Sequence, residues 1–213
     1  MARLAKIVAR QSSRPRGVLG RLWGPLLDRG TRTANRHALE ALALQGGEDV
    51  LEVGFGGGRL LSHTLDATGG HVAGLELSDA MMRRGRRRFR REIESGRLRL
   101  VEWSAARMPF PDGSFDRVVS VHTIYFWPDP QAGLREIARV LRPAGTLVLA
   151  TATKEFLSRR RTSQHGYRLF ADPELRDALE EAGLQDASVE RHDTIVTSRG
   201  TRALARPAAS SRP

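Results

Sequence analysis

The chain has 213 residues, which suits one ordinary domain, and 40% hydrophobic and 28% charged residues exclude a disordered chain. It contains no cysteine, which excludes disulfides, thiolate metal sites and cysteine nucleophiles and fits a reducing cytoplasm. No apolar run approaches the length of a membrane span, and no secretory signal is recognisable at the basic N-terminus, so we predict a cytoplasmic protein.

The formal net charge is +11, and clustered basic residues are typical of proteins that bind nucleic acid. Lys6 and Lys154 are the only lysines, so arginine supplies nearly all of this charge in a chain rich in alanine and glycine. Such a bias indicates a G+C-rich coding sequence. We therefore expect a small-molecule substrate and no nucleic-acid partner.

Residues 1–46 are interpreted as a basic helical cap. Between Val18 and Leu27 apolar residues recur at helical spacing, and Pro25 divides them into two short segments. A helix is expected from about Asn35 to Leu44, ending at Gly46-Gly47. The N-terminal stripe has three interpretations: a lid over the ligand, core packing, or peripheral membrane contact through residues 1–30.

From Glu48 onward strands and helices alternate, which indicates a parallel sheet with crossover helices and places the catalytic domain at 47–206. A helix is expected after Ser78, after Asp129-Pro130 and from Asp172-Pro173 to Gly183. The tail 207–213 is expected to be disordered. Strands are expected at 49–53, 71–76, 98–102, 115–121 and 146–152, with two more within 186–206, and a helix at 57–68.

The stretch from Val50 to Gly58 is the most informative part of the chain. It runs from a buried apolar strand into a turn with glycine at 54, 56, 57 and 58. A dinucleotide fingerprint would need glycine at 59, where this chain has Arg59, and a P-loop would need Gly-Lys-Ser/Thr. A turn of this kind presents backbone N–H groups to a ligand at a helix start.

The remaining pattern, Glu-x-Gly-x-Gly-x-Gly from Glu52, resembles the first motif of class I S-adenosylmethionine-dependent methyltransferases. The resemblance implies an α/β, Rossmann-like fold: a seven-stranded mostly parallel sheet, with one antiparallel strand and helices on both faces. It also implies S-adenosyl-L-methionine as cofactor, with its methionine part against Gly54, Phe55, Gly56 and Gly58 and its ammonium group near Glu52. A tight turn without a ligand is the alternative.

Two later segments agree with this resemblance. Glu76, followed by Leu77, ends the second strand about twenty residues after the glycine turn, where an acid binds ribose hydroxyls. Trp103-Ser104-Ala105 matches the position of the family's Gly-Asp-Ala, whose aspartate binds the adenine amino group. Ser104 replaces that aspartate, so it either makes a weaker, uncharged hydrogen bond to adenine or only caps a turn.

The segment His122 to Trp127 follows the fourth strand, where methyl donor and acceptor would meet. His122 is a candidate general base, Tyr125 a second candidate catalytic residue, and the alternative for His122 is backbone contact to the cofactor. Tyr125, Phe126 and Trp127 form either an aromatic wall for the acceptor or packing under a loop. A second candidate wall comprises His165, Tyr167 and Phe170.

These observations predict a methyltransferase that transfers a methyl group to a small molecule by in-line displacement. No metal is expected, because no cluster has convincing ligand spacing. The segment from His122 resembles small-molecule members, including quinone and phospholipid methylating branches. The alternatives are therefore an enzyme that works on such acceptors at the membrane surface, and a binding protein with this fold but no turnover.

Overall fold

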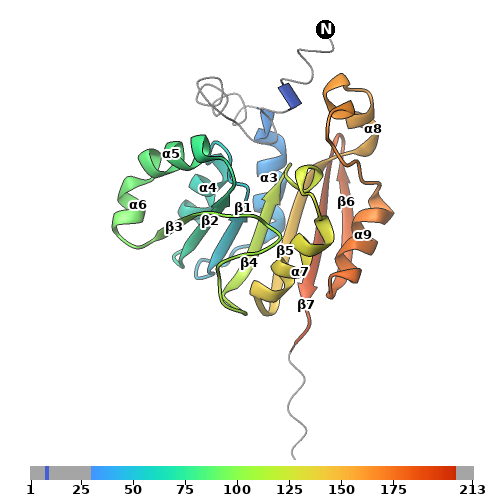
Figure 1. Ribbon diagram of the computed structural model, residues 1–213. Coiled ribbons are helices and arrows are strands. Elements are labelled where there is room, and N and C mark those ends of the chain that lie inside the picture. Colours follow the sequence, from blue (N-terminus) through green and yellow to red (C-terminus); the bar gives the residue numbers. More distant parts are fainter. Residues whose placement is uncertain (1–7, 10–29, 205–213) are drawn as a thin grey trace, which may run out of the picture.

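The computed structural model describes residues 8–9 and 30–204 and contains one seven-stranded sheet with the strand order β3-β2-β1-β4-β5-β7-β6 (Figure 1). Only β7 runs antiparallel to its neighbours β5 and β6. This confirms the predicted mostly parallel sheet. The strands are β1 Val50–Val53, β2 Val72–Glu76, β3 Leu98–Glu102, β4 Phe115–Val121, β5 Leu141–Ala152, β6 Leu184–His192 and β7 Ile195–Arg202.

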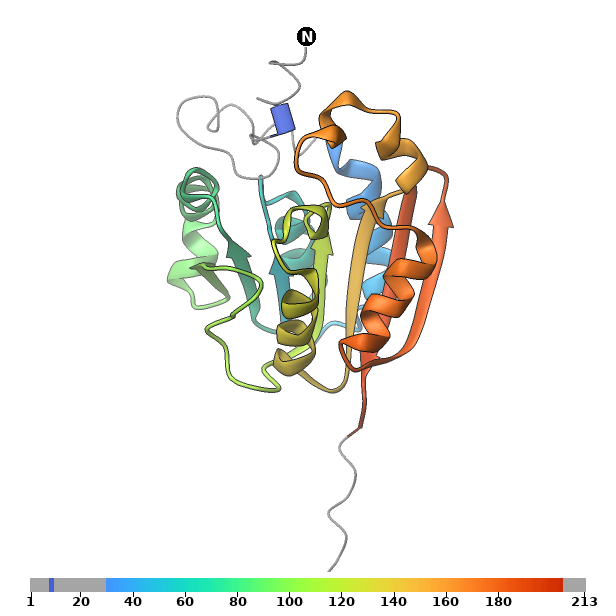
Figure 2. The same cartoon turned by 45° about the vertical axis from the view of Figure 1, so that its right-hand side comes forward.

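Helices cover both faces of the sheet (Figure 2). Helix α3 packs against β4, β5 and α4, and α4 and α5 share an apolar cluster around Phe55, so these three lie on one face. Helices α7 and α9 contact each other and cover β5, β6 and β7 on the other face. The helices are α3 Arg32–Leu42, α4 Arg59–Ala67, α5 Asp79–Arg88, α6 Arg90–Glu94, α7 Pro130–Val140, α8 Lys154–Ser158 and α9 Asp172–Glu181, with 3-10 turns η1 Ile124–Phe126 and η2 Arg161–Gln164.

The central strands explain why the sequence shows continuous apolar runs instead of alternation. Every residue of β1 and β2 is buried, because helices cover both faces of the sheet there. Helix α7 begins as predicted: Asp129 is its N-cap and accepts a hydrogen bond from the Ala132 N–H at 2.9 Å, with Pro130 in the first turn. Because β1 to β5 are parallel, their carboxyl ends lie at the same edge of the sheet.

Several predicted boundaries are wrong. β5 starts at Leu141, five residues early, because Pro143-Ala144-Gly145 forms an irregularity inside the strand and not a turn before it. The helix after Ser78 is interrupted at Phe89, and the first helix begins at Arg32 instead of Asn35. β6 begins at Leu184, which pairs with Arg202 before the sheet register shifts.

An ion-pair network ties the amino ends of the central strands together. The Arg142 guanidinium contacts Asp49 at 2.8 Å and Asp116 at 2.5 Å. Asp49 also accepts a hydrogen bond from the His71 N–H at 2.8 Å. These contacts fix the register of β1, β2, β4 and β5 at the edge opposite their carboxyl ends.

Two predictions fall partly outside the described residues. The apolar stripe Val18–Leu27 and the tail 207–213 lie there, so the division into a cap at 1–46 and a domain at 47–206 stays a prediction. Across residues 8–9 and 30–204, no helix combines the length and apolar character needed to cross a bilayer.

Candidate functional site

A cavity opens at the carboxyl ends of β1, β2, β3 and β4, with an empty volume of about 1090 Å³ that includes space open to solvent. Ligands of open α/β sheets bind at this edge. The segments that follow the four strands supply most of its wall, and α3 closes it with Thr31 and Asn35. The predicted site residues that line it are Glu52, Gly54, Phe55, Gly56, Glu76, Leu77, Ser104, Ala105 and His122.

The Glu76 carboxylate ties two walls of the cavity together. Its Oε1 accepts hydrogen bonds from the N–H groups of Leu77 and Ser78, both at 2.8 Å, and its Oε2 accepts one from the Gly56 N–H at 3.0 Å. Glu76 is 8% exposed. Backbone N–H groups stabilise the ionised form of a carboxyl group, so Glu76 presents a fixed anion beside the glycine turn.

The glycine turn has positive φ at Gly54 (78°), Gly56 (50°) and Gly58 (82°), a region that side chains disfavour. A Cβ at Gly54 would also lie 2.4 Å from Cγ2 of Thr123, so the turn packs directly on the segment after β4. Gly58 has a different role. It does not line the cavity, and a Cβ at Gly58 would lie 2.7 Å from Cε2 of Phe89, so its absence makes room for that ring.

Glu52 belongs to the buried wall that β1 contributes to the cavity. It is 3% exposed and lines the cavity one residue before Val53 and two before Gly54. Phe55 contributes backbone to the turn, while its ring packs in the cluster with Leu61 and Met82. The turn is therefore held in place by the packing of the Phe55 ring and by the hydrogen bond from the Gly56 N–H to Glu76.

The wall after β2 and β3 is apolar. Leu77 is 43% exposed and Trp103 44% exposed, and both line the cavity. Ser104 caps the local turn, because its Oγ accepts a hydrogen bond from the Ala106 N–H at 3.3 Å. Trp103 was not predicted as a site residue, although the sequence placed it where the family has glycine.

His122 and Tyr125 are joined to β5 by a chain of hydrogen bonds. The Ala152 N–H donates to the Tyr125 hydroxyl oxygen at 2.6 Å, and that oxygen lies 2.6 Å from Nδ1 of His122. When the Tyr125 hydroxyl donates to Nδ1 of His122, the proton of the neutral imidazole lies on Nε2. Desolvation lowers the pKa of His122 to about 4 and raises the pKa of Tyr125 above its ordinary value.

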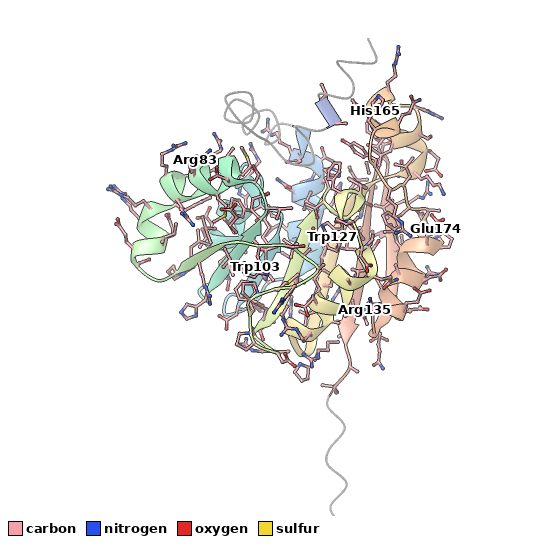
Figure 3. The ribbon with its side chains drawn as sticks, viewed as in Figure 1. Arg83, Trp103, Trp127, Arg135, His165 and Glu174 are labelled. Atoms are coloured by element: carbon pink, nitrogen blue, oxygen red, sulfur yellow. The ribbon has the colours of Figure 1, made fainter. Side chains whose placement is uncertain are left out.

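The predicted aromatic wall is only partly at the cavity. Phe126 and Trp127 line it, whereas Tyr125 lies behind His122 and does not. Tyr167 packs on Tyr125 and Phe126 with ring centroids 5.7 and 4.6 Å apart, and is likewise not part of the lining. Figure 3 shows His165 near α8, well away from the labelled Trp103 and Trp127.

Other cavity residues were not predicted from the sequence. Arg59, the first residue of α4, lines the cavity together with Asp129. Asn35 is buried on α3 and donates a hydrogen bond to Thr31 Oγ1 at 3.3 Å. The signal for Arg59 was its place directly after the glycine turn; the sequence carries none for Asn35, which reaches the site by helix packing.

His122 also borders a second hollow, between α3, the end of β5 and the β6–β7 hairpin. His37 of α3 and His192 of β6 stack there with ring centroids 4.1 Å apart. Ala152 and Ile195 add apolar surface. The two hollows thus share one residue at the end of β4.

Comparison with known proteins agrees with this geometry. A family model described as a methyltransferase domain matches residues 51–149. The uncharacterized methyltransferase YdaC of Bacillus subtilis is 28% identical over 161 residues, 75% of this chain and 83% of that protein. A demethylmenaquinone methyltransferase of Tropheryma whipplei is 34% identical over 137 residues, which is 63% of this chain but only 53% of that protein.

Solved structures show the same fold. A SAM-dependent methyltransferase from Aquifex aeolicus has a TM-score of 0.71 at 20% identity, with 86% of this chain and 98% of that chain covered. A putative methyltransferase in complex with the Haloferax volcanii Trm112 methyltransferase activator has a TM-score of 0.70 at 22% identity, with 86% and 97% covered.

The strand order is that of a Rossmann-like fold, and the glycine-lined cavity lies at the carboxyl ends of its strands, where such sheets bind ligands. Residues 51–149 thus carry a methyltransferase domain, and the chain is similar to class I S-adenosylmethionine-dependent methyltransferases. The cavity suits S-adenosyl-L-methionine, because it combines buried acids, glycine backbone at positive φ and an exposed apolar pair.

A pair of glycine variants tests the packing role of position 58. Gly58→Ala and Gly183→Ala both place a side chain at positive φ, 82° and 85°, but only Gly58 faces a close neighbour. Left-handed strain costs about 1–2 kcal/mol at either site. We expect Gly58→Ala to lower the free energy of unfolding in urea by at least about 1 kcal/mol more than Gly183→Ala. Equal losses would show that Phe89 yields without cost.

A second prediction concerns acid stability. The folded pKa of His122 lies below its ordinary value of 6.5, so folding is favoured fully above pH 6.5 and this contribution is lost as the pH falls toward 4. We expect about 2 kcal/mol of the free energy of unfolding to disappear over that range through His122.

Chemical denaturation at several pH values measures this loss. His122→Asn should flatten the slope between pH 6.5 and 4, whereas His63→Asn, a change at an exposed residue of α4, should leave it as in the wild type. Parallel curves for the wild type and His122→Asn would contradict the assignment of a desolvated neutral imidazole.

Proposed function

We propose that the chain methylates a small-molecule acceptor by in-line displacement on S-adenosyl-L-methionine. The observation that carries the proposal is one cavity whose wall joins the glycine turn, the Glu76 carboxylate and the aromatic segment after β4. The first two features suit the cofactor. The third provides an apolar place for an acceptor beside it.

We assign parts of the cavity to parts of the cofactor. Glu76 would accept hydrogen bonds from ribose hydroxyls, and Glu52 would face the ammonium group. The backbone at Gly54, Phe55 and Gly56 would lie against the methionine part, because no side chain intrudes there. Leu77, Ser104 and Ala105 would surround adenine, and His122 would contribute its backbone and ring edge.

When bound, the cofactor supplies a methyl group on a sulfonium, which is already a good leaving group. The protein therefore has to align the acceptor and exclude water. Phe126 and Trp127 supply the apolar surface for this. The Gly54–Thr123 packing holds that surface against the cofactor-binding turn.

The predicted general-base role of His122 gains no support from its hydrogen bonds. With a pKa of about 4 the ring is neutral at physiological pH, and when Nδ1 accepts from Tyr125 the ring carries its proton on Nε2. In that tautomer the His122 ring has a donor at Nε2 and no free acceptor. We infer that the acceptor nucleophile is a carbon, a neutral amine or an oxygen that arrives deprotonated, and that Tyr125 positions His122.

For the acceptor we propose a class of compound and not a single molecule. The hollow beyond His122 offers it room next to the cofactor cavity. Similarity to a demethylmenaquinone methyltransferase supports a quinone-like acceptor as a second candidate, at the membrane surface. Peripheral contact through residues 1–30, a cytoplasmic location and the absence of a nucleic-acid partner stay predictions.

Transfer of tritiated methyl groups tests the proposed acceptor class. The enzyme is incubated with labelled cofactor and, in parallel, a small-molecule extract, total RNA, and vesicles loaded with quinones. Label should enter the small-molecule extract or the quinone vesicles. Label in RNA alone, or cofactor binding without transfer to any pool, would contradict the proposal.

The Glu76 assignment is tested by a matched pair of variants. Glu76→Gln keeps the shape of the side chain but removes the charge, and should weaken S-adenosylhomocysteine binding in calorimetry by about 10- to 100-fold. Glu102→Gln alters the residue paired with Glu76 in the sheet, outside the cavity lining, and should leave binding unchanged. A similar affinity for both variants would remove Glu76 from the site.

A further inference from the structure

We propose that this chain recognises the base of its cofactor by stacking on Trp103, not by a hydrogen bond to the purine 6-amino group. The inference rests on the proposed cofactor site. It follows that a nucleoside cofactor whose purine lacks the 6-amino group binds nearly as well as the adenosyl compound. Trp103 is then the residue that sets base affinity.

The sheet register places Trp103 next to the proposed ribose anchor. Glu76 of β2 pairs with Glu102 of β3, so the residues that follow them, Leu77 and Trp103, leave adjacent strands at the same edge. The backbone N–H of Trp103 donates a hydrogen bond to the backbone carbonyl oxygen of Glu76 at 3.1 Å, which holds the two strand ends together. A base attached to a ribose at Glu76 therefore lies within reach of both side chains.

The exposure of these side chains indicates a surface that a ligand covers. In the described part of the chain, Leu77, Trp103 and Leu204 are the large hydrophobic residues that remain exposed. Two of the three stand side by side on the cavity wall. Exposed apolar surface is unfavourable in water, and an indole stacks readily on any purine because every base has a π face.

The polar groups near this wall are committed to the protein. The Ser104 hydroxyl accepts a hydrogen bond from the Ala106 N–H, which leaves a neutral and partly satisfied oxygen where the family has a carboxylate. Glu76 is held by three N–H groups beside the glycine turn, and Asp129 caps α7 beyond β4. Among the described residues, the cavity lining that follows β3 therefore contains no carboxylate, and Glu76 across the sheet is already engaged by backbone N–H groups.

The two modes of base recognition predict different selectivity. A charge-assisted hydrogen bond to the amino group would favour adenine over plain purine by about 10- to 100-fold. Stacking depends on the ring system, so it changes little when the amino group is removed. A neutral hydroxyl already engaged with the backbone adds at most a few-fold preference.

Calorimetry with S-adenosylhomocysteine and its 6-deamino analogue, in which purine replaces adenine and N1 is kept, tests the proposal. We expect wild-type dissociation constants within about threefold of each other. Ser104→Asp restores the carboxylate and should raise the preference for adenine to about tenfold or more, while Ser104→Asn, of the same size but neutral, should resemble the wild type.

The stacking surface has its own variant and control. Trp103→Ala should weaken binding of both compounds by about tenfold or more, whereas Leu204→Ala removes an exposed apolar side chain outside the cavity and should have no effect. Circular dichroism confirms that each variant is folded.

Three results would overturn the inference: a wild-type preference for adenine above about tenfold, an unchanged preference in Ser104→Asp, or full affinity in Trp103→Ala. Each leaves the cofactor site itself in place, because S-adenosylhomocysteine still binds. Failure of both compounds to bind the wild type would instead overturn the proposed function together with this inference.

Discussion

The hydrogen bond from the Gly56 N–H to the Glu76 carboxylate is the contact on which the site depends. It joins the turn after β1 to the end of β2, two segments twenty residues apart, and the N–H groups of Leu77 and Ser78 hold the same carboxylate from the other side. Because the anion is fixed before any ligand arrives, the cavity needs little rearrangement to accept a nucleoside. Gly56 reaches this carboxylate with a positive φ of 50°, a conformation that glycine adopts readily.

The wall of the cavity formed by the segment after β4 is held in a fixed conformation but offers little acid–base chemistry. Ala152, Tyr125 and His122 form a hydrogen-bonded series that runs from β5 to the cavity and leaves a neutral imidazole at its end. His122 has a positive φ of 56°, a strained conformation that this series and the bond from its N–H to the Ala150 carbonyl oxygen stabilise. The strained conformation of His122 lowers the stability of the fold but fixes the orientation of this segment, which suits a reaction limited by alignment.

Much of this arrangement could be predicted from the sequence, because it depends on local chemistry. The Glu52–Gly58 pattern and the strand-end Glu76 identify the cofactor edge, and alternating elements imply the parallel sheet. The start of β5 was missed because Pro143-Ala144-Gly145 has the composition of a turn but is accommodated within the strand. The sequence also carries no signal for the packing of Gly58 against the Phe89 ring of a later helix junction.

The position of Tyr125 behind His122, and the presence of Asn35 in the wall, depend on packing between segments far apart in the chain, which no local pattern records.

The central claim is that the two strand ends joined by Glu76 hold the nucleoside. Backbone amide NMR during titration with S-adenosylhomocysteine tests it most directly. The largest shift changes are expected at Gly54, Gly56, Leu77 and the Trp103 indole. Unchanged signals there, with changes confined to the β6–β7 hairpin, would contradict the account.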